Sequence, residues 1–319
     1  MAYSAGDTIL DDEYNTFVNS SSSPFGYNHF AGPGSGEYGL NQSTISTVSA
    51  GGTVQASQWN SLFTAMDNIA NHTNTSITAS SVSAGDTIAV RAALISDLAN
   101  LAAAVAGGST GATALADRAA GTSTNSGTWN STSTIERSIT FANNATMRAF
   151  FNAGGSIKID PGTSGSTDGD KDTAFNDLAN AVGVLELKAH ATTRSGSGEV
   201  QTSFDSGNGF HDLGTGYTSK ILLTSDNANY TSNTLEISAK LNAAVGSATV
   251  LTVKMVSSDP SDDTDNYTPG NPTTPGGVAN PNECPAMVLA LTASEPTAAA
   301  GLASAIQYSS TAEVSNSAS

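Results

Sequence analysis

The sequence of 319 residues has little of the material that several protein classes require. Its one cysteine, Cys284, excludes a disulfide framework within the chain. Charged residues make up 12% of it, about half of the usual share. The 28 acidic and 11 basic residues give a formal net charge of −17. Because a surface of that sign repels phosphate backbones and anionic lipids, we expect no nucleic-acid partner and no peripheral membrane binding.

Long apolar runs are also missing. No stretch approaches the roughly 20 apolar residues that span a bilayer, and residues 98–106, largely alanine, are interrupted by Asn100. The first residues lack the basic and apolar regions of a secretory signal. These absences predict a soluble protein that is made in the cytoplasm without export and does not insert into a membrane.

The sequence shows no pattern typical of catalysis or of a cofactor. Gly-x-Ser-x-Gly, phosphate-binding loops and paired zinc ligands are all missing. The four histidines occur in unrelated contexts, so we expect polar surface or loop positions for all of them: His29, His72, His190 and His211. We therefore predict a protein that is not an enzyme and holds no cofactor.

Two acidic loops are the candidates for ion binding. Asp168, Asp170 and Asp172 alternate in a Gly-rich turn, as hard-cation ligands do, but the EF-hand pattern fails because Thr173 and Ala179 replace its glycine and glutamate. The second loop holds Asp259, Asp262, Asp263 and Asp265. Solvated turns are the favoured interpretation of both loops, with calcium as the weaker alternative. Cys284 lacks a basic neighbour, which argues against a reactive thiol.

Charge and composition divide the chain. All eleven basic residues lie between Arg91 and Lys254, so the first 90 residues contain none. Residues 107–127 are rich in Gly, Ser and Thr and read as a linker. We therefore predict an N-terminal unit over 1–106, a linker over 107–127 and a second domain over 128–319, which contains a long loop at 259–285.

The N-terminal unit contains a degenerate repeat. Residues 4–9 (SAGDTI) recur at 49–54 (SAGGTV) and at 83–88 (SAGDTI), and residues 14–17 (YNTF) match 59–62 (WNSL). The spacings of 45 and 34 residues are too irregular for a solenoid. Three related turn-strand-helix elements that pack on one another are the better explanation.

Apolar spacing predicts helices over about 55–72 and 89–106, the second ended by Gly107-Gly108. Their outer faces carry Ser, Thr, Asn and Ala, which suits cover by another subunit. Residues 19–39 read as an extended arm whose aromatic residues anchor it to a partner. The candidate interface residues are Phe25, Tyr27, Phe30 and Tyr38 on the arm, with Tyr14 and Trp59 in the repeat.

Beyond residue 128 the apolar period changes from about 3.6 to 2. Alternation at 185–189, 235–241 and 251–255 predicts half-buried strands, and 135–141, 156–160, 217–224 and 287–291 are further strand candidates. Short helices are expected at 144–152 and 173–182. The predicted fold is multi-domain α+β: a small helical N-terminal unit with an extended arm, then an antiparallel β-sandwich-like domain with short helices.

Residues 133–160 form a strand, then Met147-Arg-Ala-Phe-Phe-Asn-Ala-Gly-Gly155, then a second strand. This block resembles virion structural proteins of tailed bacteriophages. The opening Gly6-Asp-Thr-Ile9 and its echo Val54-Gln-Ala-Ser-Gln-Trp-Asn-Ser-Leu62 look like the starts of the same group. The resemblance implies a tail, fibre or other structural role and supplies no catalytic residues. From the residues alone, Asn143 or Asn144 caps the helix, and its apolar face packs across a sheet or against a subunit.

The favoured hypothesis is a homo-oligomeric tail or tail-appendage protein of a virion, partnered by itself and by other virion proteins. A capsid-decorating or neck protein is the alternative within that class. A glycan-binding adhesin that recognises a host surface belongs to another class; its sites would be the loops around 205–217 and 259–285, with Phe204, Phe210 and Tyr217 as stacking residues. A glycan depolymerase comes third, because no carboxylate pair stands out.

Overall fold

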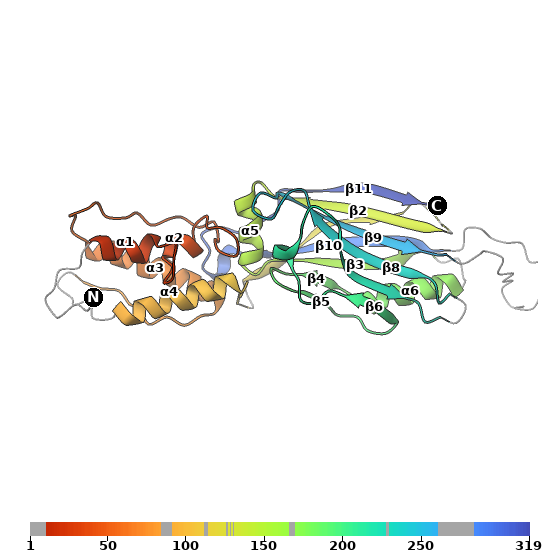
Figure 1. The fold of residues 1–319 in the computed structure, drawn as a ribbon, viewed down its shortest axis with the longest axis horizontal. Helices are drawn as coiled ribbons and strands as arrows, with labels where there is room; N and C mark the ends of the chain where they lie inside the picture. Colours follow the sequence, from red (N-terminus) through yellow and green to blue (C-terminus); the bar gives the residue numbers. More distant parts are fainter. Residues whose placement is uncertain are drawn as a thin grey trace, which may run out of the picture. The chain divides into compact units, whose positions relative to one another are not determined.

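The computed structural model describes residues 11–83, 91–111, 114–125, 127, 129, 131–165, 170–227, 230–260 and 284–319. Contacts divide the chain into two units. The first, the helical unit, comprises Met1–Ala116, Asn143–Gly155 and Ser294–Gln307. The second, the β unit, comprises Asp117–Ala142, Ser156–Ala293 and Tyr308–Ser319. The expected α+β class with a sandwich-like arrangement of antiparallel sheets is confirmed (Figure 1).

This division differs from the one expected from composition. Residues 107–127, read as a linker, contain strand β1 (Leu115–Thr124). The helix expected to pack across a sheet, α5 (Asn144–Asn152), groups with the helical unit. Composition missed both because a strand made mostly of Ala, Gly, Ser and Thr looks like a linker and because α5 joins its unit through contacts that are distant in sequence.

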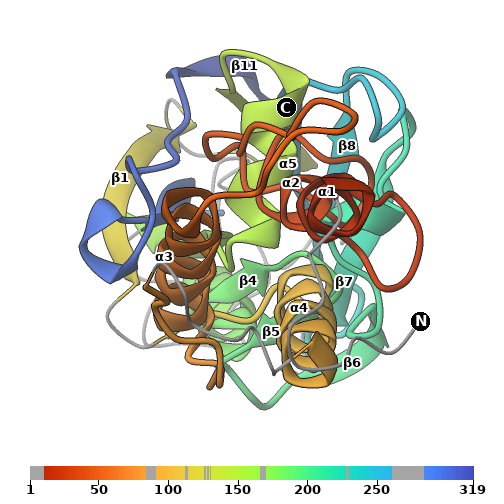
Figure 2. The ribbon, with the colours of Figure 1, turned by 90° about the vertical axis from the view of Figure 1, so that its left-hand side faces the viewer.

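The helical unit contains α1 (Asp11–Asn19), α2 (Tyr27–Phe30), α3 (Ala56–Thr73), α4 (Arg91–Ala106), α5 and the short turn η2 (Ala298–Ala300). Figure 2 looks along α3 and α4, which contact each other, while α2 contacts α1 and α4. The core centres on the ring of Trp59, which lies 5.1 Å from Tyr14, 5.9 Å from Phe17 and 5.7 Å from Phe63. The two helices predicted from periodicity, α3 and α4, are thus present within a few residues of the expected bounds.

The repeat acquires a structural meaning in two asparagines. The side-chain amide of Asn15 on α1 donates to the backbone oxygen of Val48 (2.8 Å), and its oxygen accepts from the Val48 N–H (2.7 Å). Asn60 on α3, at the equivalent repeat position, makes the same pair of hydrogen bonds with the backbone oxygen and N–H of Val82, both at 2.8 Å. We call these two asparagines the clamps. Val48 and Val82 each precede a repeat copy directly. Residues 4–9 and 84–88 of the other copies lie outside the described residues.

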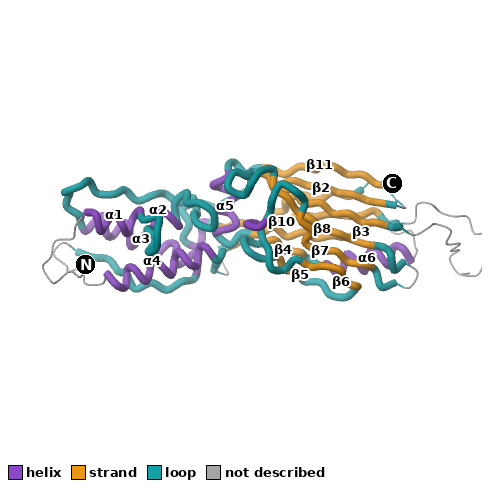
Figure 3. Tube along the Cα trace, viewed as in Figure 1, coloured by secondary structure: helices purple, strands orange, loops and turns teal. Residues whose placement is uncertain are grey.

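Two sheets form the body of the β unit (Figure 3). One has the strand order β1-β10-β3-β4-β5, and the other β11-β2-β9-β8-β7-β6. The first adds β10 (Ala286–Pro296), β3 (Ser156–Ser164), β4 (Leu185–Leu187) and β5 (Thr192–Arg194) to β1. The second consists of β11 (Ser310–Ala318), β2 (Thr132–Thr140), β9 (Val250–Ser258), β8 (Thr234–Leu241), β7 (Thr218–Thr224) and β6 (Val200–Phe204).

Alternating apolar residues explain why the six-stranded sheet forms. In β8, Leu235, Ile237, Ala239 and Leu241 are buried while Glu236 and Lys240 are half-exposed. Helix α6 (Asp170–Val182) contacts strands of both sheets, namely β3, β7 and β8. The short turn η1 (Phe210–Asp212) lies between β6 and β7.

Candidate interaction surface

Of the predicted interface residues, most are core residues. Tyr14, Trp59, Tyr27 and Phe30 are at most 4% exposed inside the helical unit. Their assignment to an interface is corrected on that ground, because a buried ring cannot reach a partner while the unit is folded. Phe25 and Tyr38 keep partial exposure. The arm is also not fully extended, because it folds into α2 between them.

Phe25 and Tyr38 lie in a three-ring group that we call the aromatic cluster: Phe25, His29 and Tyr38. Phe25 stacks on His29 with ring centroids 4.5 Å apart and an interplanar angle of 8°. Tyr38 lies 4.8 Å from both of the other rings. All three side chains are half-buried. Sequence reasoning did not place His29 in this group, because Phe25 precedes α2 and no helical spacing relates the two residues.

Desolvation by burial lowers the pKa of His29 below its ordinary value of 6.5. A neutral imidazole at neutral pH follows from that direction. The aromatic cluster is therefore an uncharged surface with ring faces and one phenol, a combination that favours packing against another protein surface.

A Gly-rich loop, residues 33–39, holds Tyr38 in this position. Gly34, Gly36 and Gly39 have φ values of 49°, 59° and 103°, which favour glycine. The Gly39 N–H donates to the backbone oxygen of Phe30 at 3.0 Å, which returns the loop to the end of α2. The Asn28 side chain makes two hydrogen bonds with the backbone of Ile45, at 2.9 and 2.8 Å, and so fixes the chain that follows the loop.

Helix α5 holds this loop through side-chain hydrogen bonds to its backbone. The guanidinium of Arg148 donates to four backbone oxygens of the loop, those of Pro33, Gly34, Gly36 and Tyr38, at 3.2–3.4 Å. Asn152, one turn further on, donates to the backbone oxygens of Gly36 and Gly39. Arg148 is 7% exposed, so its charge is satisfied almost entirely by loop carbonyls and by Asn144 Oδ1 at 2.9 Å. The loop is thereby held in one conformation.

The start and end of α5 follow the predicted pattern. The Asn143 side chain accepts from the Thr146 N–H at 2.8 Å, and Gly154 leaves the helix with a φ of 82°. Met147, Phe150 and Phe151 are fully buried. A subunit contact through the two phenylalanines, the second interpretation of this helix, is therefore not available in the folded unit.

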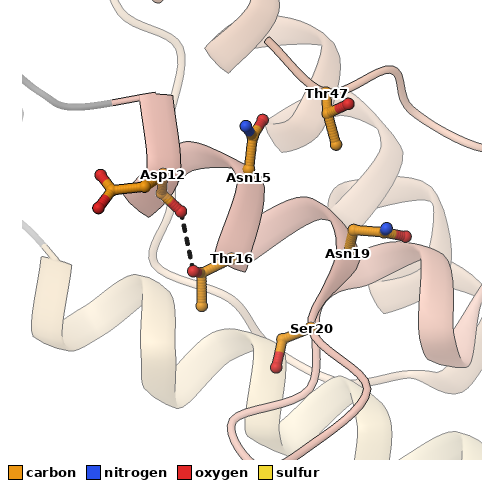
Figure 4. A pocket seen from close by; sticks show the side chains of 6 residues that line it. All are labelled: Asp12, Asn15, Thr16, Asn19, Ser20 and Thr47. Atoms are coloured by element: carbon orange, nitrogen blue, oxygen red, sulfur yellow. Dashed lines mark hydrogen bonds between the residues drawn. The ribbon is translucent and has the colours of Figure 1, made fainter. Parts of the chain in front are cut away.

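A shallow hollow of about 320 Å³ lies beside α1 (Figure 4). Its lining is polar: Asp12, Asn15, Thr16, Asn19, Ser20 and Thr47. Within it the Thr16 hydroxyl donates to the Asp12 backbone oxygen at 2.9 Å, and the Asn15 side chain is hydrogen-bonded to the backbone of Val48. The hollow offers hydrogen-bonding groups but no convergent constellation for chemistry.

The residues considered for glycan stacking have other roles. Phe210 is fully buried. The ammonium groups of Lys240 and Lys254 lie 4.2 and 4.0 Å from the centroid of the Tyr217 ring. Desolvation raises the pKa of Tyr217 above its ordinary value. The Arg194 guanidinium lies 5.5 Å from the centre of the Phe204 ring. Most of the proposed loop at 259–285 lies outside the described residues.

The ion-binding and histidine expectations have mixed outcomes. Asp168 and the side chain of Asp170 lie outside what the structure describes, and Asp172 is half-buried at the start of α6. Within the described part of the chain no group of His, Cys, Asp or Glu residues could hold a metal ion. His72 is fully buried, with Nε2 2.9 Å from the Ala153 oxygen, so the expected surface position is wrong for it. Asp259 is also buried rather than solvated.

No family matches this chain, and no curated protein or solved structure is significantly similar to it. Of the helices that the structure describes, none combines the length and apolar character needed to cross a membrane.

Proposed function

We propose that this chain is a non-enzymatic structural component of a tailed-phage virion that assembles as a homo-oligomeric tail or tail-appendage protein. The resemblance of residues 133–160 to virion structural proteins motivates the choice of particle. A capsid-decorating or neck protein is the alternative place within the same particle.

The observation that carries the proposal is the aromatic cluster, whose Tyr38 lies on the loop held by α5. Tyr38 lies on the loop that Arg148 and Asn152 hold, and its half-buried ring packs against the rings of Phe25 and His29. Since this loop is already ordered, docking would cost little further conformational entropy at these side chains. Aromatic groups placed in this way are typical of the residues that dominate protein interfaces.

The edges of the six-stranded sheet support self-association. Val200 on β6 and Val314 on β11 are 54% and 53% exposed, the two large apolar side chains so exposed in the described part of the chain. They lie on the two opposite edge strands of one sheet. An edge strand has unpaired backbone groups on one side, which can pair with a strand of another copy. Low charge fits the same role, because burying Ser or Thr costs less than burying Lys or Glu.

The test is a double substitution, Phe25→Ser with Tyr38→Ser, measured by sedimentation equilibrium and by incorporation into particles. We expect the native chain to form a defined oligomer and the variant to associate about 100-fold more weakly, which corresponds to about 1.4 kcal/mol lost at each ring. Tyr217→Ser is the matched control, because this half-buried ring belongs to the β unit and directly precedes β7, an inner strand of its sheet. A native chain that stays monomeric at high concentration and is missing from purified particles would contradict the proposal.

A further inference from the structure

A buried lysine and a buried aspartate meet in the β unit. Lys171 Nζ on α6 lies 2.8 Å from Oδ2 of Asp259, which follows the end of β9. The two side chains are 2% and 0% exposed. For comparison, Lys158 and Asp117 form an ion pair at 2.7 Å whose side chains are 30% and 54% exposed. Lys171 and Asp259 are therefore held together out of contact with water.

The backbone around this pair is fixed on three sides. The Asp259 N–H donates to the Ser131 oxygen at 2.8 Å, and the Cys284 N–H donates to the Trp129 oxygen at 3.1 Å. The indole of Trp129 in turn donates to the Pro285 oxygen at 2.7 Å. The backbone that carries Asp259 and Cys284 is thus hydrogen-bonded to residues 129 and 131.

The surroundings are aromatic. Lys171 Nζ lies 5.9 Å from the centroid of the Tyr230 ring. Phe175, one turn after Lys171 on α6, packs edge-on against Trp129 at 4.8 Å, and both rings are at most 1% exposed. A proton passed from the ammonium to the carboxylate across the contact of 2.8 Å would leave two neutral groups in these apolar surroundings. The products of that transfer are a free amine and a carboxylic acid in contact.

We propose that Lys171 and Asp259 condense into an intramolecular isopeptide bond. After the proton transfer, the amine nitrogen attacks Cγ of Asp259 and forms the C–N bond. The bond from Cγ to Oδ2 then breaks, and Oδ2 leaves as water with the transferred proton and a second proton from the nitrogen. One ammonium and one carboxylate thus give one amide and one water, and no oxidant or other reactant is consumed.

Cys284 is placed to assist the leaving oxygen. Its Sγ lies 3.2 Å from Oδ2 of Asp259, the same oxygen that Lys171 contacts. A thiol hydrogen bond to Oδ2 stabilises negative charge that develops there as the C–O bond breaks. Cys284 is fully buried, so its thiol is shielded from competing reactions in solution. We assign it the role of stabilising the leaving oxygen.

The bond would tie α6 covalently to the end of β9 and so fasten a helix to the six-stranded sheet. This inference does not depend on the proposed virion role, although a permanent fastening suits a protein that bears load.

Intact-mass spectrometry of the denatured full chain tests the proposal. We expect the native chain to be lighter than its sequence by one water molecule, and Lys171→Arg and Asp259→Ala to have their full sequence masses. Lys158→Arg, in the exposed ion pair, is the control and should keep the loss. Digestion should release one branched peptide that contains Lys171 and Asp259. A native chain at full sequence mass after prolonged incubation would overturn the proposal, and this result does not depend on whether a variant folds. Cys284→Ala should slow the loss of water after refolding several-fold, and an unchanged rate would remove the cysteine from the mechanism.

Discussion

Arg148→Ala is the sharpest perturbation of the candidate interaction surface. The side chain donates to four carbonyls of residues 33–39 at 3.2–3.4 Å, and hydrogen bonds from a charged donor contribute about 1.5–3 kcal/mol each. The low end of that range suits bonds of this length and would total about 6 kcal/mol. Because four hydrogen bonds that share one guanidinium are not additive, we expect a total loss of about 3 kcal/mol rather than the full sum.

Hydrogen exchange gives the most direct assay, because the loop amides of Gly39 and Asn41 donate to backbone oxygens of Phe30 and Gly32. A loss of about 3 kcal/mol would accelerate their exchange by about 100-fold. Arg194→Ala is the matched control, since its guanidinium donates to one backbone oxygen, that of Ala181, at 3.3 Å. Unchanged protection of the loop amides in Arg148→Ala would refute the claim that α5 locks the loop.

Two further predictions concern the helical unit. Asn15→Ala and Asn60→Ala should each lower its free energy of unfolding by about 2 kcal/mol, because each removes two hydrogen bonds to the backbone. Asn71→Ala is the control: its exposed amide bonds only to another exposed side chain, so the change should be less than about 0.5 kcal/mol. Chemical denaturation measures this, and a loss confined to one of the two clamps would disprove their equivalence. Desolvation lowers the pKa of His72, so the unfolded chain binds a proton that the folded unit does not; the stability contribution is present above about pH 6.5 and is lost as pH falls below it. As the pH is lowered from 8 to 5, the free energy of unfolding obtained from melting curves should decrease more steeply in the native chain than in His72→Gln. The difference between the two slopes should be at most about 1.4 kcal/mol per pH unit. Identical slopes would show that His72 is not responsible.

Local patterns were informative wherever burial faces one side of an element. The apolar stripe of 55–72 predicted α3, and the alternation at 235–241 predicted β8. The Asn143 cap and the Gly154 exit also follow from neighbouring residues alone. In each case the physical cause acts within one turn or one strand, so the chain carries the information in sequence order.

Candidate-site residues were harder to judge. Six aromatic residues were expected at an interface, and the structure buries four of them. A sequence pattern shows that a ring prefers cover, but it does not show whether the cover comes from the same chain or from a partner. Asp259 shows the converse case, a residue that was expected to be solvated and is buried. An acidic loop residue is normally solvated, and the buried partner of Asp259, Lys171, lies far away in sequence.

Sequence alone determined the class of fold, the helices α3 to α6 and most strands of the six-stranded sheet, because burial of one face makes apolar residues recur at a regular spacing along the chain. Only the tertiary structure decided that α5 locks the loop 33–39, that Asn15 and Asn60 are equivalent clamps, and that Lys171 meets Asp259. The strand β11 also belongs to this second group, since its largely exposed residues lack alternation and its pairing with β2 depends on backbone groups that every sequence shares.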